Sequence, residues 1–154
     1  HSLGFPVEAL VFSQPDSIHG DAKTNYQILA KMDLTPLFFP SPLDFERITD
    51  LFQRSTWIID ALLGTGLTGE TRSPYRELID LINSTSCPVL SIDLPSGLDC
   101  DQGIALGTAV HATHTATLVA PKKGFTHPGA SIFTGHIHTL DIGIPRELIA
   151  SLVH

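Results

Sequence analysis

The sequence predicts an α/β protein built around a mostly parallel sheet that helices cover on both faces. Three observations support this prediction: short apolar runs alternate with amphipathic segments, hydrophobic residues make up 42% of the chain, and charged residues make up only 16%. Strand and helix patterns that alternate in this way are typical of βαβ units, whose parallel strands are buried between helices. A chain of 154 residues with this composition suits one domain with a sizeable core, which excludes a disordered protein.

Strands are expected where apolar residues run consecutively, and helices where they recur every three or four positions. In chain order, the expected strands are 7–12, 36–40, 56–64, 88–94, 115–120 and 136–142. The expected helices are 21–32, with Asp21 placed to cap its start, one from about Asp44, one that follows Ser73 and Pro74, and a last amphipathic piece at 145–153. Because no helix pattern separates the last two strands, we expect the end of the chain to be more meander-like.

The charge and the cysteine content exclude several classes of protein. The formal net charge is -7, and no basic stripe is available to replace the counterions of a nucleic acid. No apolar stretch approaches the roughly 20 residues of a membrane span. With 2 cysteines there is neither a disulfide framework nor a cysteine-rich zinc site. We therefore expect a cytoplasmic protein that binds neither nucleic acid nor membrane.

Ligands of open α/β sheets bind outside the carboxyl ends of the strands, and the loop after the third expected strand is unusual there. Its glycines 64, 66 and 69 match G-x-G-x-x-G, a pattern whose backbone N–H groups can approach an anion closely. The next helix pattern begins only at Ser73 and Pro74. This late start favours a loop around a ligand over the turn of a dinucleotide-binding unit. The alternative is a plain strand-to-helix loop. Asp60, inside the apolar run before this loop, calls for a partner or a metal ion.

Two further loops carry candidate chemistry. Asp93 ends an apolar run and is followed by Pro95-Ser96-Gly97, so it suits general acid/base work at a sharp turn. Its alternative role is to cap that turn by accepting backbone hydrogen bonds. Lys122 and Lys123 follow the fifth expected strand and could face an anionic ligand, or could simply be exposed.

The histidines are a weaker signal. His136 and His138 would share one face of a strand, a spacing that could hold a metal ion, and His111 and His114 are three positions apart. Neither pair has an evident third ligand in the sequence, which favours surface or turn histidines.

Taken in order, the motifs DALLGTGLTGE, PYRELIDLIN, PVLSIDLPSGLD, APKKG and DIGIP resemble the YjeF N-terminal family, the NAD(P)H-hydrate epimerases. The resemblance runs from Asp60 to Pro145. It implies a Rossmann-like three-layer α/β/α fold, often as a homodimer. It also implies epimerisation of hydrated NADH and NADPH (NADHX and NADPHX) at C6, with a bound potassium ion.

The resemblance also implies roles for individual residues. Asp60 and Ser96 would hold potassium, and Asp93 would be the catalytic acid. The residues implied in substrate binding are Gly64, Thr65, Gly66, Leu67, Thr68, Gly69, Glu70, Asp93, Lys122 and Lys123.

One departure from the family is large. Its members carry an Asn-Asn-Gly-Gly-Asp type loop after their first strand, and this sequence has none. We therefore expect a single YjeF N-terminal-like domain, residues 1–154, that lacks its N-terminal strand and Gly-rich phosphate loop. Such a chain would bind NADPHX weakly and leave a sheet edge for a second chain to fill.

Other functions remain open at this point. One is a conventional NAD(P)-dependent reductase, which would need a helix that opens at Gly66 to Gly69. Another is a non-catalytic dimerisation or scaffold module of the same fold. A fused or separate ADP/ATP-dependent dehydratase is a further possible partner of an epimerase.

Overall fold

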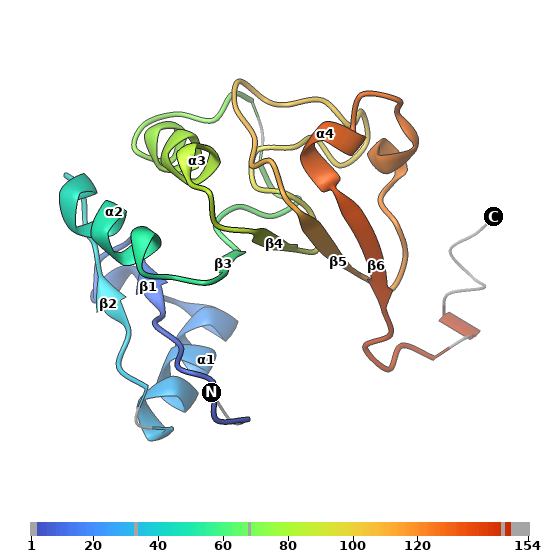
Figure 1. Ribbon diagram of the computed structural model, residues 1–154. Coiled ribbons are helices and arrows are strands. Elements are labelled where there is room, and N and C mark those ends of the chain that lie inside the picture. Colours follow the sequence, from blue (N-terminus) through green and yellow to red (C-terminus); the bar gives the residue numbers. More distant parts are fainter. Residues whose placement is uncertain (1–2, 33, 68, 146, 149–154) are drawn as a thin grey trace. The chain divides into compact units, whose positions relative to one another are not determined.

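The computed structural model describes residues 3–32, 34–67, 69–145 and 147–148 (Figure 1). The chain divides into two compact units, His1–Glu46 and Arg47–His154. Within the described ranges, none of the helices combines the length and the apolar character needed to cross a membrane.

The first unit is a small βαβ arrangement. Strand β1 (Leu10–Val11) pairs in parallel with β2 (Leu37–Phe38), and the 3₁₀ helix η1 (Pro15–Ser17) and helix α1 (Gly20–Lys31) lie between them in the chain. The aromatic pair Tyr26–Phe38, with ring centroids 5.7 Å apart, packs α1 against β2. Both strands lie inside the runs that the sequence predicts, although each is shorter.

The start of α1 differs from the expectation. His19 is the N-cap residue, and Asp21 lies inside the first turn of the helix. The expected capping role of Asp21 is therefore wrong, because the helix begins one residue earlier. The Asp21 carboxylate still lies at the helix end that favours negative charge.

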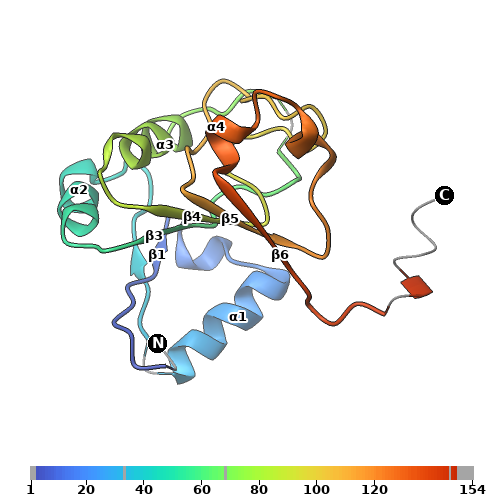
Figure 2. The same cartoon turned by 45° about the vertical axis from the view of Figure 1, so that its right-hand side comes forward.

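The second unit contains a four-stranded sheet. Its order is β3 (Ile58–Asp60), β4 (Val89–Ile92), β5 (His114–Leu118) and β6 (His136–Leu140), and every neighbouring pair is parallel. Figure 2 shows these strands side by side. The predicted α/β fold with a mostly parallel sheet is confirmed.

Helices α2 (Phe45–Gln53) and α3 (Tyr75–Ser84) form where the sequence predicts amphipathic segments. Their apolar stripes are buried, as expected of surface helices that cover a core. The buried residues are Ile48, Leu51 and Phe52 of α2 and Leu78, Ile79 and Ile82 of α3.

The expectation of a meander-like end is wrong. Strands β5 and β6 are parallel, and the connection between them contains η2 (Lys123–Thr126) and α4 (Ser131–Thr134). Parallel neighbours require a crossover, and this one uses helices too short to give a periodic pattern. In both views α3 and α4 lie on the same side of the sheet (Figures 1 and 2).

The two faces of this sheet differ in exposure. Ile58, Asp60 and Val89 point to the buried face. Ile59, 55% exposed, and Ile92 point the other way. Side chains alternate between the two faces along each strand, so one face of the sheet is covered by helices and the other is accessible.

Candidate functional site

Polar residues meet at the carboxyl ends of three adjacent strands. Asp60 is the last residue of β3, Asp93 follows β4 directly, and Lys122 lies in the connection after β5. Parallel strands bring these ends to one edge of the sheet, which is where α/β proteins place their ligands.

Asp60 is a buried carboxylate whose oxygens are fully used. Only 1% of the residue is exposed. Oδ2 accepts hydrogen bonds from the Ser91 hydroxyl at 2.7 Å and the Ser96 N–H at 2.9 Å. Oδ1 accepts from the Ser96 hydroxyl at 2.5 Å and the Leu62 N–H at 3.3 Å. Four donors offset the cost of burying the charge, which explains how an acid can occupy this apolar run.

The contact of Asp60 with Ser96 bears on a bound cation. Carboxylate and hydroxyl oxygens are suitable ligands for a hard cation. The Ser96 hydroxyl also lies 3.3 Å from the Leu63 carbonyl oxygen, a second acceptor. If the hydroxyl proton turns to Leu63, Asp60 Oδ1 keeps only the Leu62 N–H as a donor. The Ser96 oxygen, which also accepts the Leu63 N–H at 2.9 Å, then keeps one free lone pair. These two oxygens are of the kind that accepts the potassium ion implied by the resemblance.

Asp93 has a strained backbone. Its φ is +70°, and the Leu94 N–H donates to the Ile92 carbonyl at 2.9 Å, so Asp93 is the central residue of a γ-turn. Val119 repeats this arrangement after β5, with φ +69° and a hydrogen bond from the Ala120 N–H to the Leu118 carbonyl. γ-Turns of this hand are rare, and strain of this kind gathers at functional sites.

The Asp93 side chain joins the two turns. Its Oδ1 accepts a hydrogen bond from the Leu118 N–H at 3.0 Å and forms an ion pair with the Lys122 ammonium. The Asp93 and Lys122 side chains are 27% and 20% exposed, so both can meet a ligand while most of their surface is covered. Lys123 is exposed at the start of η2. Of the two candidate lysines, the structure brings Lys122 to the acid.

The turn after Asp93 is packed tightly against the segment that follows it. Ser96 accepts a hydrogen bond from the Val110 N–H at 2.9 Å through its carbonyl. Gly97 has φ +88°, and a Cβ built on it would lie 2.1 Å from the Thr108 carbonyl oxygen. Only glycine satisfies both the backbone conformation and this close approach.

The glycine loop after β3 is open by comparison. None of its described residues 64–67 and 69–70 is helical: 65–66 lie in a turn and 69 in a bend, and the Leu67 N–H donates to the Gly64 carbonyl at 3.3 Å. A Cβ on Gly64 or Gly66 would meet nothing within 4 Å. The expected loop, rather than an opening helix, therefore follows β3, which removes the feature that the reductase alternative needs. Thr68 lies outside the described residues.

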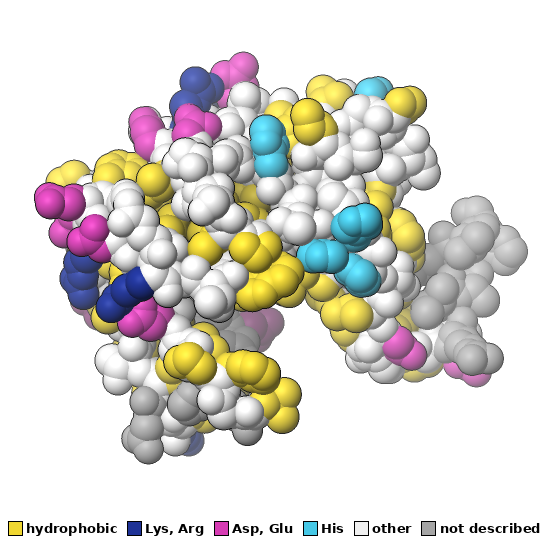
Figure 3. All heavy atoms as spheres, viewed as in Figure 1, with side chains coloured by type: hydrophobic (Ala, Val, Ile, Leu, Met, Phe, Trp, Pro, Cys, Tyr) yellow, Lys and Arg dark blue, Asp and Glu magenta, His cyan; other side chains and the backbone are white. Residues whose placement is uncertain are grey.

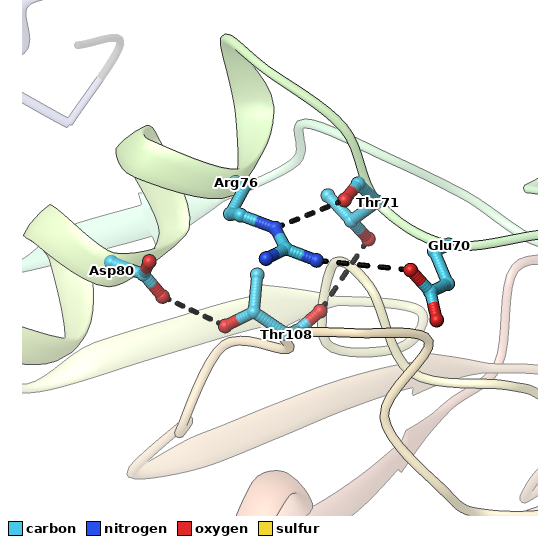
Figure 4. A network of polar contacts seen from close by, with 5 residues as sticks. All are labelled: Glu70, Thr71, Arg76, Asp80 and Thr108. Carbon is cyan, nitrogen blue, oxygen red and sulfur yellow. Dashed lines mark hydrogen bonds and ion pairs between the residues drawn. The ribbon is translucent and has the colours of Figure 1, made fainter.

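The end of this loop is held by a polar network (Figure 4). The Thr71 N–H donates to the Leu106 carbonyl at 2.8 Å, and its hydroxyl lies 3.4 Å from the Thr108 carbonyl. From the first turn of α3, Arg76 donates to the Thr71 carbonyl at 3.4 Å and forms an ion pair with Glu70 at 3.9 Å. The network fixes where the loop rejoins the fold.

Sequence reasoning missed two features of the second unit. Ser91, a partner of Asp60, stands opposite it in the β3–β4 register, and a polar residue inside an apolar run could have signalled it. His114 lies beside His138 because of the β5–β6 pairing, whereas the sequence paired it with His111. The His111 ring instead packs against Phe133.

Asp99, Cys100 and Asp101 form another compact group, with potential ligand atoms within 4.8 Å of one another. One oxygen of Asp99 accepts the N–H groups of Asp101 and Gln102, each at 2.8 Å, as in an ordinary turn. Burial and the two neighbouring acids raise the pKa of the Cys100 thiol, which disfavours the thiolate needed for a metal ligand or nucleophile. This group is therefore best explained as part of the turn.

Comparisons with known proteins identify relatives of this chain. The chain is 38% identical over 153 residues to the NAD(P)H-hydrate epimerase of Pirellula staleyi, covering 98% of this chain and 66% of that protein. It is 35% identical over 149 residues to the bifunctional NAD(P)H-hydrate repair enzyme Nnr of Moorella thermoacetica, covering 96% of this chain and 28% of that protein.

A solved structure shares the fold. The crystal structure of the yeast protein ynu0 matches with a TM-score of 0.74 at 18% identity, covering 96% of this chain and 59% of that one. The chain thus spans less than two thirds of the length of the relatives it matches. The model of the YjeF-related protein N-terminus matches residues 1–124, and the chain belongs to that family.

Proposed function

We propose that this chain epimerises hydrated NADH and NADPH, interconverting the R and S forms at C6. The observation that carries the proposal is the Asp93–Lys122 ion pair, held by a strained turn at the ligand-binding edge of the sheet. The names of the relatives from Pirellula staleyi and Moorella thermoacetica, which both refer to NAD(P)H hydrate, support the choice of substrate.

The reaction requires little from the enzyme beyond proton transfer. The hydrate carries a hydroxyl group on C6, next to the ring nitrogen. When that hydroxyl leaves as water, the nitrogen lone pair stabilises a planar iminium ion, and water can return to either face. The enzyme must protonate the leaving oxygen, stabilise the cation and accept a proton when water adds, without any change in oxidation state.

Asp93 and Lys122 can together provide these functions. The Lys122 ammonium donates to Asp93 Oδ1, so a proton lies between the two groups. We propose that the Lys122 proton passes through Asp93 to the leaving hydroxyl, which departs as water and leaves Lys122 as a neutral amine. The Asp93 carboxylate then stabilises the iminium ion. When water adds, its proton passes back through Asp93 to Lys122, which restores the ion pair.

The glycine loop is proposed to bind the rest of the substrate. Positions 64–66 and 69–70 are exposed in the loop that follows β3, and their backbone N–H groups would face the substrate. Such groups suit the pyrophosphate of the cofactor. Leu67 and Thr68 belong to the same proposed segment, as the resemblance implies.

Asp60 and Ser96 are proposed to hold potassium. When bound, the ion would supply positive charge that offsets the phosphates of the substrate. Because Asp60 is buried and has several hydrogen bonds, its own part in catalysis would be to fix the Ser96 turn beside Asp93. Assembly as a homodimer, a cytoplasmic location and a fused or separate ADP/ATP-dependent dehydratase are further proposals, the last in line with a relative named as bifunctional.

The direct test is an epimerisation assay. NADHX purified as one epimer is incubated with this chain in potassium buffer, and the two epimers are separated by HPLC over time. We expect faster equilibration than in buffer alone, and slower equilibration when sodium replaces potassium. A folded chain that leaves the spontaneous rate unchanged would exclude the proposed activity, and equal rates in the two salts would exclude the potassium site.

A further inference from the structure

Lys122 reaches Asp93 at the end of a short segment whose backbone is strained. Val119, a β-branched residue, has φ +69°, a conformation that such residues rarely adopt. Lys122 follows as the N-cap residue of η2. Strain of this kind persists only where surrounding contacts hold the backbone in place. The contacts of residues 117–122 therefore decide where the Lys122 ammonium lies.

Leu118, just before the strained residue, bonds to both members of the ion pair. Its N–H donates to Asp93 Oδ1 at 3.0 Å, and its carbonyl oxygen accepts a hydrogen bond from the Lys122 ammonium at 3.4 Å. The same carbonyl accepts the Ala120 N–H at 2.8 Å, which closes the γ-turn. A change in the orientation of this turn would therefore move Lys122 and Asp93 relative to each other.

The Thr117 side chain ties this turn to the core. Its hydroxyl donates to the Ala120 carbonyl at 3.3 Å, a hydrogen bond that spans the whole γ-turn. Thr117 is 0% exposed, so packing fixes the position from which its hydroxyl acts.

The other end of the segment is held by backbone contacts. The Gly124 N–H donates to the Cys100 carbonyl at 2.7 Å. A Cβ built on Gly124 would lie 2.5 Å from the Gly103 nitrogen, so the two chain segments touch directly. Because these contacts do not involve Thr117, a substitution there would loosen the segment at one end only.

A second threonine of β5 provides a matched comparison. Side chains alternate along the strand, and Figure 3 shows histidine and hydrophobic side chains together over β5 and β6 on the accessible face, where His114 and Ala116 line an open hollow. Thr115 and Thr117 point to the opposite face, and both are 0% exposed. The Thr115 hydroxyl also donates to a backbone carbonyl, that of Thr134, at 2.7 Å. The two threonines thus differ mainly in whether the carbonyl they bind belongs to the Lys122 segment.

We propose that Thr117 is a positioning residue that holds Lys122 against Asp93. The inference rests on the proposed function, in which a proton passes from Lys122 through Asp93 to the leaving hydroxyl. Such a transfer requires the two groups to stay within hydrogen-bond reach. Loosening the segment would therefore slow the chemical step without changing how the glycine loop binds the substrate.

Labelling with acetic anhydride tests the position of Lys122 independently of activity. The Lys122 side chain is 20% exposed and paired with Asp93, whereas Lys123 is exposed and serves as the internal reference. Thr117→Val keeps the shape of the side chain and removes the hydroxyl. We expect it to raise the labelling rate of Lys122 relative to Lys123 severalfold, as measured by mass spectrometry. Thr117→Ser, which retains a hydroxyl, and Thr115→Val should both label like the unmodified chain.

Kinetics with NADHX test the consequence for the reaction. In Thr117→Val, kcat should fall about tenfold or more, since a misplacement of about 1 Å can cost about 100-fold. The Michaelis constant should not change, and Thr117→Ser should restore kcat. Thr115→Val should leave kcat unchanged. In a chain that carries Lys122→Met, Thr117→Val should cause no further loss, because the effects of residues that act through one another do not add.

The two experiments separate this inference from the proposed function. Unchanged labelling of Lys122 in Thr117→Val would overturn the inference whatever the activity of the chain, as would a loss of kcat that persists in full beside Lys122→Met. Increased labelling with unchanged kcat would support the positioning role and exclude Lys122 from the proposed chemistry. Circular dichroism of each variant checks the fold, and urea denaturation of Thr115→Val measures what the loss of a buried hydroxyl costs by itself.

Discussion

The loops that follow β3 and β4 use glycine in opposite ways. After β4, Gly97 lies where any side chain would collide with the Thr108 carbonyl, and its neighbours 94–98 are buried. After β3, Gly64 and Gly66 face open space. The turn after β4 is thus determined by the fold, whereas packing does not explain the glycines after β3. This contrast is what we expect if one loop holds the reacting group and the other receives a ligand.

The largest expected effect is at the turn after β4. Asp93→Asn keeps the shape of the side chain but removes its ability to carry a proton. We expect the epimerisation rate to fall by about 10²–10⁴-fold, the usual contribution of a general acid or base. The rate is measured by HPLC of the epimers, and circular dichroism checks the fold.

Asp101→Asn is the matched control, because Asp101 is an exposed acid in the segment that follows the Asp93 turn. It should leave the rate unchanged. Undiminished turnover in a folded Asp93→Asn variant would contradict the role of Asp93 and weaken the contrast between the two loops.

The second prediction concerns stability. Gly97→Ala forces a left-handed conformation on a residue with a Cβ and drives that Cβ into the Thr108 carbonyl. We expect the free energy of unfolding to fall by about 3 kcal/mol, combining backbone strain and overpacking. Urea denaturation measures this loss. A loss below about 1 kcal/mol would show that the turn can relax and is less rigid than its contacts indicate.

The third prediction, Gly66→Ala, tests the other member of the comparison, the open loop after β3. The added methyl group meets nothing within 4 Å, so the free energy of unfolding should change by less than about 1 kcal/mol. The added methyl group should nevertheless keep a phosphate from reaching the N–H at position 66. The Michaelis constant for the cofactor hydrate should then rise at least about tenfold, since losing one charge-assisted hydrogen bond costs about 1.5–3 kcal/mol. An unchanged Michaelis constant would indicate that the backbone at position 66 does not approach the substrate.

Much of the fold could be predicted from the sequence because it depends on local patterns. Apolar runs locate every strand among the described residues, and the periodic stripes locate α2 and α3. Strand lengths could not be predicted, because they depend on pairing: β3 covers Ile58–Asp60 rather than 56–64, and the chain then turns toward Ser96. The short crossover helix α4 gives no periodic signal.

The site was predictable to the extent that its residues stand in motifs. The motifs single out Asp60, Asp93 and Ser96, but the choice of Lys122 over Lys123 depends on the strained turn that brings its ammonium to Asp93. The proximity of His114 to His138 depends on the register between β5 and β6, which no local pattern specifies. The sequence alone therefore could not predict the contacts between segments that are far apart in the chain.

The smallest expected effect is where the loop after β3 passes into α3. The Ser73 hydroxyl donates a hydrogen bond to the Glu77 carboxylate and holds the pKa of Glu77 below its usual value. Because the lowered pKa belongs to the folded state, this stabilisation is present above the usual pKa of a glutamate. It is lost as the pH falls through the lowered value. Ser73→Ala should therefore reduce stability slightly at neutral pH, and the difference from the unmodified chain should vanish in acid. Urea denaturation at about pH 7 and about pH 3, on either side of the usual glutamate pKa, measures this difference in stability.

Ser84→Ala, at the other end of α3, is the control. It removes a hydroxyl that bonds a carbonyl rather than an acid, so any difference in stability that it causes should not depend on pH. A Ser73→Ala difference that persists in acid would show that Ser73 stabilises the start of α3 without Glu77.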